Sequence, residues 1–420
     1  CDFMKIVFIS NMTPYKENYK GTSALPYHMM FHRNSSWVKN ELNLSENDNI
    51  EIDVYSFNLN NLPFDKIKET ENKLNVRIHI VPIPQWFRRM ISLHLLSLRI
   101  FLKYPIHYYL KLPRKYIDEI KAKQPDGIWI YGEEMSNVSS KFPDFPKVHT
   151  TVDCTSLYYY RLLHSDVKLN IFQKVKAYIN FKKFLRLEKN YPITNIKYHL
   201  VGDGDRNFLV DHAPKVNAFF IRHPHYEISK KMSLEALAQR KFNKPIRVLI
   251  AGQNNIYMRT DIHKIITLLC DKDNKDINDF IRSYTLTFLG KGWENYVSLL
   301  KSSGWDVYHK IFVEDYIGEV SKHDIQLTPI DIGTGTKGKV LDALANGLLV
   351  IGSGYAIENI AVENQCSCLE YHKASDVLNF LKDIPTNLSK YEGMARCGYN
   401  NVLKYHGRER VARDFFKLFM

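Results

Sequence analysis

The segment from residue 328 to 353, TPIDIGTGTKGKVLDALANGLLVIGS, combines the residue types that bind a phosphate-bearing ligand. A short apolar run ends at Pro329, a glycine-rich loop follows, and a helical pattern leads to Gly347 and a second apolar run. Glycines let a backbone approach a ligand closely, and the first turn of a helix presents unpaired N–H groups and a partial positive charge. The segment therefore predicts an anion site, although a packing turn with solvated lysines would use the same residues.

Side chains in and beside this loop add to that prediction. The candidates for ligand contact are Gly333, Thr334, Gly335, Thr336, Lys337, Lys339 and Asp342. The two lysines supply full positive charges for a phosphate, and the carboxylate inside the helix can accept hydrogen bonds from sugar hydroxyls. The site therefore fits a phosphate that has hydroxyl groups close to it.

Carboxylates follow two apolar strands that we expect in the first half of the chain. Glu133 and Glu134 come after the run at 127–132, and Asp153 ends the run at 148–153. Because ligands of open α/β sheets bind beyond the carboxyl ends of the strands, we expect these carboxylates to face one cleft. A general base must lie within hydrogen-bond distance of the proton that it takes. Asp153 is our candidate for such a base and Glu134 is the second; capping of the following helix is the alternative role for Asp153.

Two further strand ends carry candidate contacts to a phosphate. Gly21 and Thr22 follow the strand expected at 5–11 and can bring backbone amides and small side chains to the ligand, or else form an ordinary surface loop. Arg259 follows the strand expected at 246–252. Its planar guanidinium can bind a diphosphate through two parallel hydrogen bonds.

Strands and helices alternate along both halves of the chain, which predicts parallel sheets covered by helices on both faces. The strands expected in the first half lie at 5–11, 50–57, 76–83, 127–132, 148–153, 198–203 and 217–223. Those expected in the second half lie at 246–252, 285–290, 306–312, 325–330, 348–353 and 366–371. A polar stretch places the boundary near residue 240. The predicted fold class is α/β, with two doubly wound, Rossmann-like domains at 1–240 and 241–405 and a closing helix at 406–420.

The run GTGTKGKVLDALANGLLVIGS resembles the donor-binding segment of GT-B glycosyltransferases, in particular the family 4 (glycosyl transferases group 1) type. The resemblance implies two domains that face each other across a cleft, with the acceptor in the N-terminal domain and a nucleotide diphosphate sugar in the C-terminal domain. It implies transfer of the sugar to a hydroxyl of a glycan or glycolipid, as in cell-surface polysaccharide synthesis. This chain has Thr334 in place of the first of the family's two glutamates. Asp342 takes the second position and can keep its ribose-binding role, so retention or inversion stays open.

The resemblance also implies roles for residues outside that run. The loop at Gly21 would lie against the donor phosphate, Arg259 would contact the diphosphate, and Phe312 and Val313 would form a wall for the nucleotide base. The helix at 406–420 would cross back to the N-terminal domain. Such enzymes stabilise the leaving diphosphate with helix dipoles and cationic side chains. We therefore expect no metal, and no cofactor besides the nucleotide-sugar substrate.

The composition fits two ordinary domains. The chain has 420 residues, of which 45% are hydrophobic, and this is enough for two cores. Its six cysteines are scattered without the paired spacing of a zinc knuckle or of a disulfide framework, as is typical of a protein of the reducing cytoplasm. We expect neither disulfides nor a metal knuckle, and no apolar run is long enough to predict a membrane span.

A formal net charge of +13 predicts an anionic partner. Residues 86–116 interleave apolar and basic side chains, and a basic amphipathic helix of this kind binds the surface of an anionic membrane. Packing of these helices on a sheet, with solvated basic faces, explains the pattern equally well. No nucleic-acid-binding motif accompanies the charge, so we expect no nucleic acid partner.

Two other functions stay open at this stage. The first is a nucleotide-sugar epimerase of the same fold, which would need a pair of carboxylates around the sugar ring. The second is a nonenzymatic, membrane-associated binding protein on the same scaffold, which would bind a nucleotide without turnover.

Overall fold

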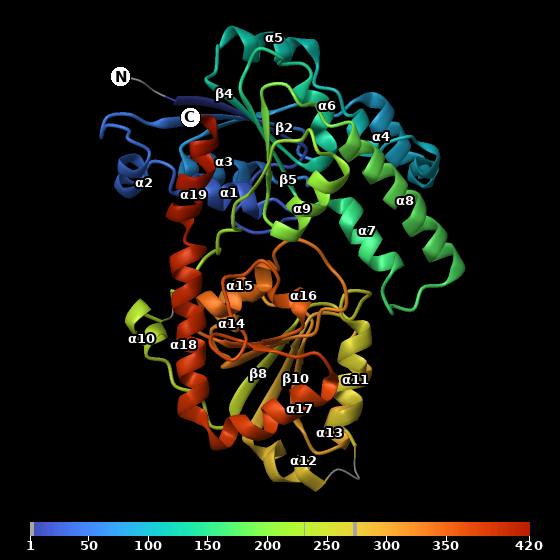
Figure 1. Cartoon of the computed structure of the whole chain (residues 1–420), viewed down its shortest axis with the longest axis vertical. Helices are drawn as coiled ribbons and strands as arrows, with labels where there is room; N and C mark the ends of the chain where they lie inside the picture. Colours follow the sequence, from blue (N-terminus) through green and yellow to red (C-terminus); the bar gives the residue numbers. More distant parts are fainter. Residues whose placement is uncertain (1–3, 231, 272–274) are drawn as a thin grey trace. The chain divides into compact units, whose positions relative to one another are not determined.

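The computed structural model of the chain describes residues 4–230, 232–271 and 275–420 (Figure 1). Contacts within the chain define two units. The N-terminal unit comprises residues 4–164, Lys168–Pro224 and Arg408–Met420, and the C-terminal unit comprises Ser165–Val167 and His225–Gly407. Each unit contains one parallel sheet with helices on both faces. The predicted α/β class with two Rossmann-like units is confirmed.

The N-terminal sheet has seven strands in the order β3-β2-β1-β4-β5-β6-β7. They are β1 (Met4–Ser10), β2 (Ile50–Ser56), β3 (Arg77–Ile80), β4 (Gly127–Tyr131), β5 (Lys147–Val152), β6 (Ile196–Leu200) and β7 (Ala218–Phe220). All neighbours pair in parallel. The strand order reverses between β1 and β4, and ligands of open α/β sheets bind at the carboxyl edge of such a switch point.

The C-terminal sheet has six strands in the order β10-β9-β8-β11-β12-β13. They are β8 (Ile246–Ala251), β9 (Tyr284–Leu289), β10 (Asp306–Lys310), β11 (Ile325–Thr328), β12 (Leu349–Gly352) and β13 (Leu369–Glu370). Its switch point lies between β8 and β11. Every strand that the sequence predicts is present, but several are shorter than predicted because their last residues turn away toward the carboxyl-edge loops.

Alternating side chains of the strands supply a core on each face of each sheet. In β8, Ile246, Val248 and Ile250 enter one core, and Leu249 and Ala251 enter the other. The helices of this unit are α10 (Leu234–Ala238), α11 (Arg259–Leu269), α12 (Lys275–Phe280), η4 (Ile281–Ser283), α13 (Glu294–Ser302), α14 (Tyr316–Val320), α15 (Gly338–Ala345), α16 (Gly354–Ile357), α17 (Ala374–Asp383), η5 (Ile384–Thr386) and α18 (Leu388–Tyr405). The first core packs on α11, α13 and α17, and the second packs on α15. This two-sided burial explains why these strands read as continuous apolar runs.

The N-terminal sheet is covered in the same way. Its helices are α1 (Ala24–Phe31), α2 (Ser36–Glu41), α3 (Phe64–Leu74), α4 (Gln85–Ser92), η1 (Leu95–Phe101), η2 (Ile106–Tyr109), α5 (Arg114–Ala122), η3 (Glu133–Met135), α6 (Ser136–Ser139), α7 (Thr155–Leu163), α8 (Ile171–Lys189), α9 (Asp203–His212), α19 (Arg408–Phe416) and η6 (Lys417–Phe419). The last α-helix of the chain, α19, belongs to this unit. Its Phe415 ring packs against Trp129 of β4, with the ring centroids 4.4 Å apart.

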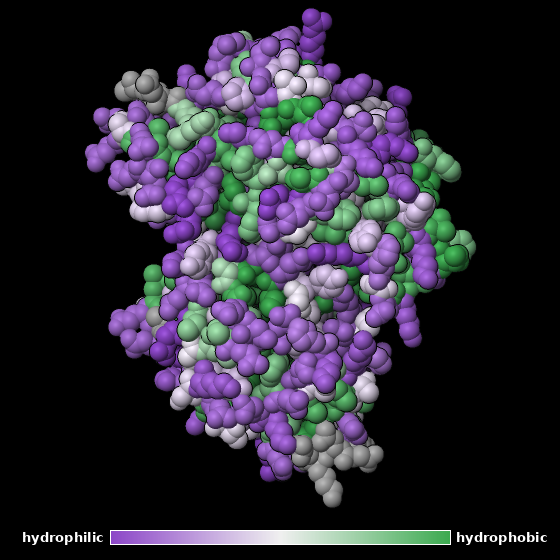
Figure 2. All heavy atoms as spheres, in the orientation of Figure 1, coloured by the Kyte–Doolittle hydropathy of each residue, from purple (hydrophilic) through white to green (hydrophobic). Residues whose placement is uncertain are grey.

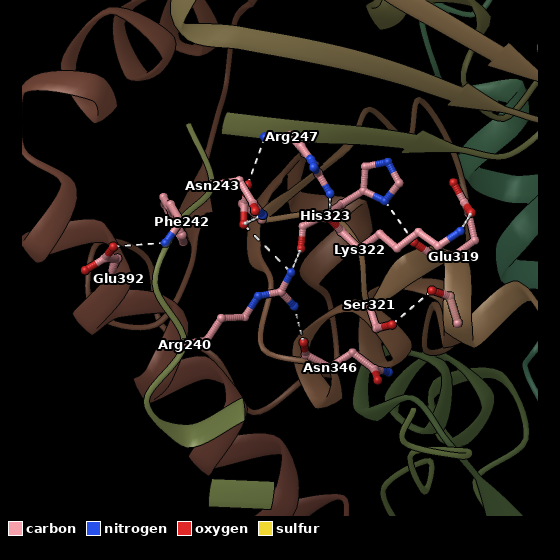
Figure 3. Close-up of polar contacts among 12 residues, drawn as sticks. Arg240, Phe242, Asn243, Arg247, Glu319, Ser321, Lys322, His323, Asn346 and Glu392 are labelled. Atoms are coloured by element: carbon pink, nitrogen blue, oxygen red, sulfur yellow. Dashed lines mark hydrogen bonds and ion pairs between the residues drawn. The ribbon is translucent and has the colours of Figure 1, made fainter. Parts of the chain in front are cut away.

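The connection before β8 is held to the C-terminal unit by buried polar contacts (Figure 3). Arg240 donates to the Asn346 carbonyl at 2.9 Å, and its guanidinium lies 3.7 Å from the buried Asp324 carboxylate. Asn243 donates to the same carboxylate at 2.8 Å. The sequence places the domain boundary near residue 240, whereas contacts place the division after Pro224. A polar stretch can therefore belong to a folded unit when buried partners satisfy its hydrogen bonds.

The basic stretch at 86–116 is not one amphipathic helix. It is divided among α4, η1, η2 and the start of α5. Pro105 and Pro113 stand immediately before η2 and α5, where each restricts the residue that precedes it to extended backbone. Among the residues that the structure describes, no helix is long and apolar enough to cross a membrane.

Candidate functional site

The glycine-rich loop of the C-terminal unit leads from β11 into α15 and is held in place by its own polar contacts. The Lys337 ammonium donates to the carbonyl of Thr334 at 2.7 Å and to that of Gly335 at 3.3 Å. Asn359 donates to the Gly335 carbonyl at 3.0 Å. Gly333 lies close to the end of the Lys337 side chain, because an added Cβ would lie 2.9 Å from the Lys337 nitrogen. Lys337 thus contacts its own loop, and Thr336 completes the turn before α15.

The first turn of α15 brings Lys339 to the carboxyl edge of the sheet. Its ammonium would lie 3.9 Å from a Cβ added at Gly252, the residue that follows β8. Burial lowers the pKa of Lys339, and the nearby Asp342 carboxylate opposes that effect. A cation and the positive end of a helix therefore occupy the same place, which is the arrangement that binds a phosphate.

Asp342 is a buried acid one turn into α15. Its side chain is 6% exposed, and its Oδ1 atom has no hydrogen-bond partner within the described part of the chain. Burial raises the pKa of Asp342 to about 7, while Lys339 lowers it. The Tyr316 hydroxyl also lacks a partner there, and the Asp342 charge contributes to its raised pKa. A buried acceptor without a partner costs free energy, which a ligand hydroxyl would recover.

Asp331 is a site residue that the sequence analysis missed. Its carboxylate accepts from the backbone N–H of Thr260 at 2.6 Å and of Asp261 at 2.7 Å, and so caps α11. This cap fixes the loop after β8 against the loop after β11. Arg259 is the first residue of α11 and is exposed. The only sequence signal was the position of Asp331 just after a strand.

The loops after β8 and β9 meet at two glycines. A Cβ added at Gly290 would lie 2.0 Å from the Gly252 carbonyl oxygen, so no other residue fits. Trp293 donates to the same carbonyl at 2.8 Å. This contact holds the carboxyl ends of β8 and β9 in register beside the start of α15.

The two residues predicted to form the base wall follow β10 and differ in burial. The Phe312 side chain is 78% exposed. Val313 packs against the core that contains α15. An exposed ring at a strand end is available to a planar ligand, whereas Val313 anchors the loop.

In the N-terminal unit, the carboxyl edge brings Asp153 close to the loop after β1. Tyr131 at the end of β4 donates to the Thr22 carbonyl at 2.9 Å, and the Asp153 charge contributes to its raised pKa. Val152, just before Asp153, has φ of +73°, which is rare and costly for a β-branched residue. Gly21 lies against Met12, whose sulfur would be 2.3 Å from an added Cβ. The structure therefore brings Gly21, Thr22 and Asp153 to one edge.

The carboxylates after β4 have different partners. Glu134 lies 2.7 Å from His107 Nδ1, and its side chain is 22% exposed. Glu133 is buried and accepts a hydrogen bond from the Thr155 hydroxyl. Glu134 therefore has an imidazole beside it, whereas Glu133 belongs to a separate buried cluster.

No protein-family model and no curated protein sequence matches this chain. Solved structures match it over nearly its whole length. HepE of Anabaena, in complex with UDP and glucose, is 10% identical with a TM-score of 0.56, over 99% of this chain and 98% of that one. Sucrose-phosphate synthase from Thermosynechococcus elongatus is 12% identical with a TM-score of 0.59, over 99% and 98%. TarM is 11% identical with a TM-score of 0.61, over 99% of both chains. The chain has the GT-B fold.

Within the GT-B fold of this chain, the predicted residues fall into two groups. One group lies at the carboxyl edge of the C-terminal sheet and comprises Arg259, Phe312, Val313, Gly333, Thr334, Gly335, Thr336, Lys337, Lys339 and Asp342. The other lies at the carboxyl edge of the N-terminal sheet and comprises Gly21, Thr22, Glu134 and Asp153. The first group can hold a phosphate and a hydroxyl. The second presents a carboxylate beside a tight backbone turn.

Proposed function

We propose that this protein is a glycosyltransferase that moves a sugar from a nucleotide diphosphate sugar to a hydroxyl of a glycan or glycolipid. The observation that carries the proposal is the buried Asp342 acceptor, one helical turn after a cationic helix N-terminus. A ribose hydroxyl can donate to this acceptor, and a diphosphate can bind at the cationic helix N-terminus. Structures of the same fold support this reading, since HepE is solved with UDP-glucose and S. aureus TarM with UDP.

In this proposal the diphosphate lies at the first turn of α15, with Lys339 and Arg259 as its cations. Positive charge at this place stabilises the leaving diphosphate, so transfer would need no metal. Lys337 takes a role besides the one that its charge suggests. Because it donates to two carbonyls of its own loop, it also positions that loop.

Donor binding can be tested with two variants and a matched control. Lys339→Ala and Asp342→Ala should each weaken UDP, GDP or ADP binding by about one to two powers of ten, because each removes a charge-assisted hydrogen bond of roughly 1.5–3 kcal/mol. Lys322→Ala, which loses a lysine paired with Glu319 just before β11, should bind as the wild type does. Calorimetry measures all three affinities. Equal affinity in every variant would remove α15 from the donor site.

For the acceptor we propose Asp153 as the general base. Asp153→Asn should lower turnover by roughly two to four powers of ten with little change in nucleotide affinity, because the carboxylate acts on the acceptor proton. Glu134→Gln is the control, since Glu134 is held by His107. Release of nucleotide diphosphate from the sugar donor, measured with a panel of saccharide acceptors, reports turnover. Loss of turnover in the Glu134 variant alone would assign the base to the neighbouring strand end.

We further propose that the acceptor is reached at an anionic membrane. An apolar and basic surface of the N-terminal unit supports this, and Figure 2 shows apolar side chains exposed at the right-hand edge of the view. Its exposed apolar residues are Leu93, Leu95, Leu98, Ile100, Phe101, Ile171, Phe172, Val175 and Tyr178. Arg186 of α8 donates to the Lys103 carbonyl at 3.1 Å, so the two segments that form it lie side by side. Residues 85–104 and 167–187 contain no Asp or Glu.

Vesicle binding tests this membrane surface. The double variant Phe101→Ser and Phe172→Ser removes two rings that are each 83% exposed, and should lower binding to anionic vesicles about ten-fold or more. Phe64→Ser, on α3, is the control because that ring is 73% exposed outside this surface. Wild-type binding should also fade as salt rises. Equal binding to neutral and anionic vesicles, or equal binding by all variants, would show that these residues have no membrane role.

A further inference from the structure

Three helices of the N-terminal unit bring a thiol, a carboxylate and an imidazole together. Cys154 stands just before α7, Glu188 lies in the last turn of α8, and His212 ends α9. Each offers one ligand atom, and these atoms all lie within 4.8 Å of one another. Cys154 and Glu188 are each 1% exposed. No part of the proposed transfer reaction uses this cluster.

The Glu188 carboxylate is the centre of the cluster. One oxygen lies 2.6 Å from His212 Nε2, and the other lies 3.4 Å from Cys154 Sγ. The backbone N–H of Ser156 donates at 3.1 Å to the oxygen near Cys154, and the Ser156 hydroxyl donates to the oxygen near His212. Asp205 accepts from the Cys154 backbone at 2.9 Å and so ties α9 to the start of α7. The three side chains are therefore held in place by contacts behind them.

A second, independent observation points to a ligand at this place. Glu133 Oε1, Tyr191 Oη and His212 Nδ1 are buried with no hydrogen-bond partner among the described residues. Glu133 is 8% exposed and Tyr191 is 5% exposed. Both lie beside the cluster, because Glu133 accepts from Thr155, the residue after Cys154, and Tyr191 packs in the same buried core as Cys154. Buried polar groups are nearly always satisfied, so several without partners at one point require an explanation.

The acidic groups of the cluster favour a bound cation. Cys154 Sγ lies 3.4 Å from a Glu188 oxygen. Thr155, whose hydroxyl donates to the buried Glu133 carboxylate, is the next residue after Cys154. Several acids in one dry place repel one another when ionised, and a divalent cation reverses this repulsion by replacing their protons.

We propose that the N-terminal unit binds one zinc ion through Cys154, Glu188 and His212, with Glu133 facing the fourth position. Thiolate sulfur, imidazole nitrogen and carboxylate oxygen are the ligands that zinc prefers. At bond lengths of about 2.0–2.3 Å, tetrahedral ligand atoms lie roughly 3.3–3.8 Å apart, so shifts of about an ångström complete the site. Ser156 and Asp205 then orient the ligands from behind. Binding releases the thiol proton to solvent, and no bond to carbon changes.

This ion would join α7, α8 and α9 at the end of β5. Cys154 directly follows Asp153, so the metal would fix the backbone on which the proposed base is carried. The role is structural and is separate from the diphosphate, which the C-terminal unit holds without a metal in the proposed function.

Cobalt substitution tests the site on the full-length chain. Wild-type protein freed of metal should bind one Co²⁺ per chain, with the near-ultraviolet charge-transfer absorption of a cobalt–thiolate bond. Cys154→Ser should lose that absorption, and His212→Gln should lower Co²⁺ affinity about ten-fold or more. Cys397→Ser is the matched control, because this cysteine is exposed and lies outside the cluster.

Each outcome of the Co²⁺ experiment either supports or overturns the zinc site. Stoichiometric binding with a band that Cys154→Ser removes and Cys397→Ser keeps supports the site. Absence of stoichiometric binding by the wild type overturns it, whatever the variants do. Binding that survives in both Cys154→Ser and His212→Gln also overturns it, because the ion then has other ligands. Circular dichroism of each variant shows whether it folds. If Cys154→Ser does not fold, the Co²⁺ stoichiometry of the wild type and the Co²⁺ affinity of His212→Gln test the site.

Discussion

The burial of the Asp342 carboxyl, whose Oδ1 atom has no hydrogen-bond partner among the residues that the structure describes, is the constraint around which the C-terminal unit is arranged. In water this group would be ionised and solvated, but here burial raises its pKa to about 7. The cost is tolerable only if a ligand supplies the missing hydrogen bond, or if function requires the acid there. Lys339 is placed one turn earlier, where it offsets part of that cost and faces the carboxyl edge of β8.

The surroundings of this acid are rigid for identifiable reasons. Gly290 and Gly252 approach more closely than any side chain would allow, and Asp331 caps α11 from the neighbouring loop. Lys337 and Asn359 hold the glycine-rich loop from inside. A phosphate can then be bound by groups that need little reordering, which is what makes a helix N-terminus an effective anion site.

Much of this architecture could be predicted from the sequence, because strands buried on both faces read as apolar runs and glycines mark their carboxyl-edge loops. The class of fold and the segment at 328–353 were predicted in this way. Asp331, Tyr316 and Glu188 were not, since their roles arise only when distant loops and helices meet. The scattered cysteines do not indicate the proposed metal site, because motif spacing finds only ligands that are close in sequence. The stretch at 86–116 does not form one amphipathic helix but is divided into shorter helical segments, and Pro105 and Pro113 precede two of them.

Proton release on UDP binding tests the central claim most directly. If a ribose hydroxyl donates to Asp342, binding favours the ionised carboxylate and lowers its pKa from about 7. UDP affinity should then rise as pH increases through 7, and calorimetry in buffers of different ionisation enthalpy should find about half a proton released per UDP at pH 7. Asp342→Asn, which keeps the titration of the phosphate itself, should lack that release. Equal release in wild type and variant, or affinity that falls as pH rises through 7 in the wild type alone, would contradict the assignment of Asp342 to the donor.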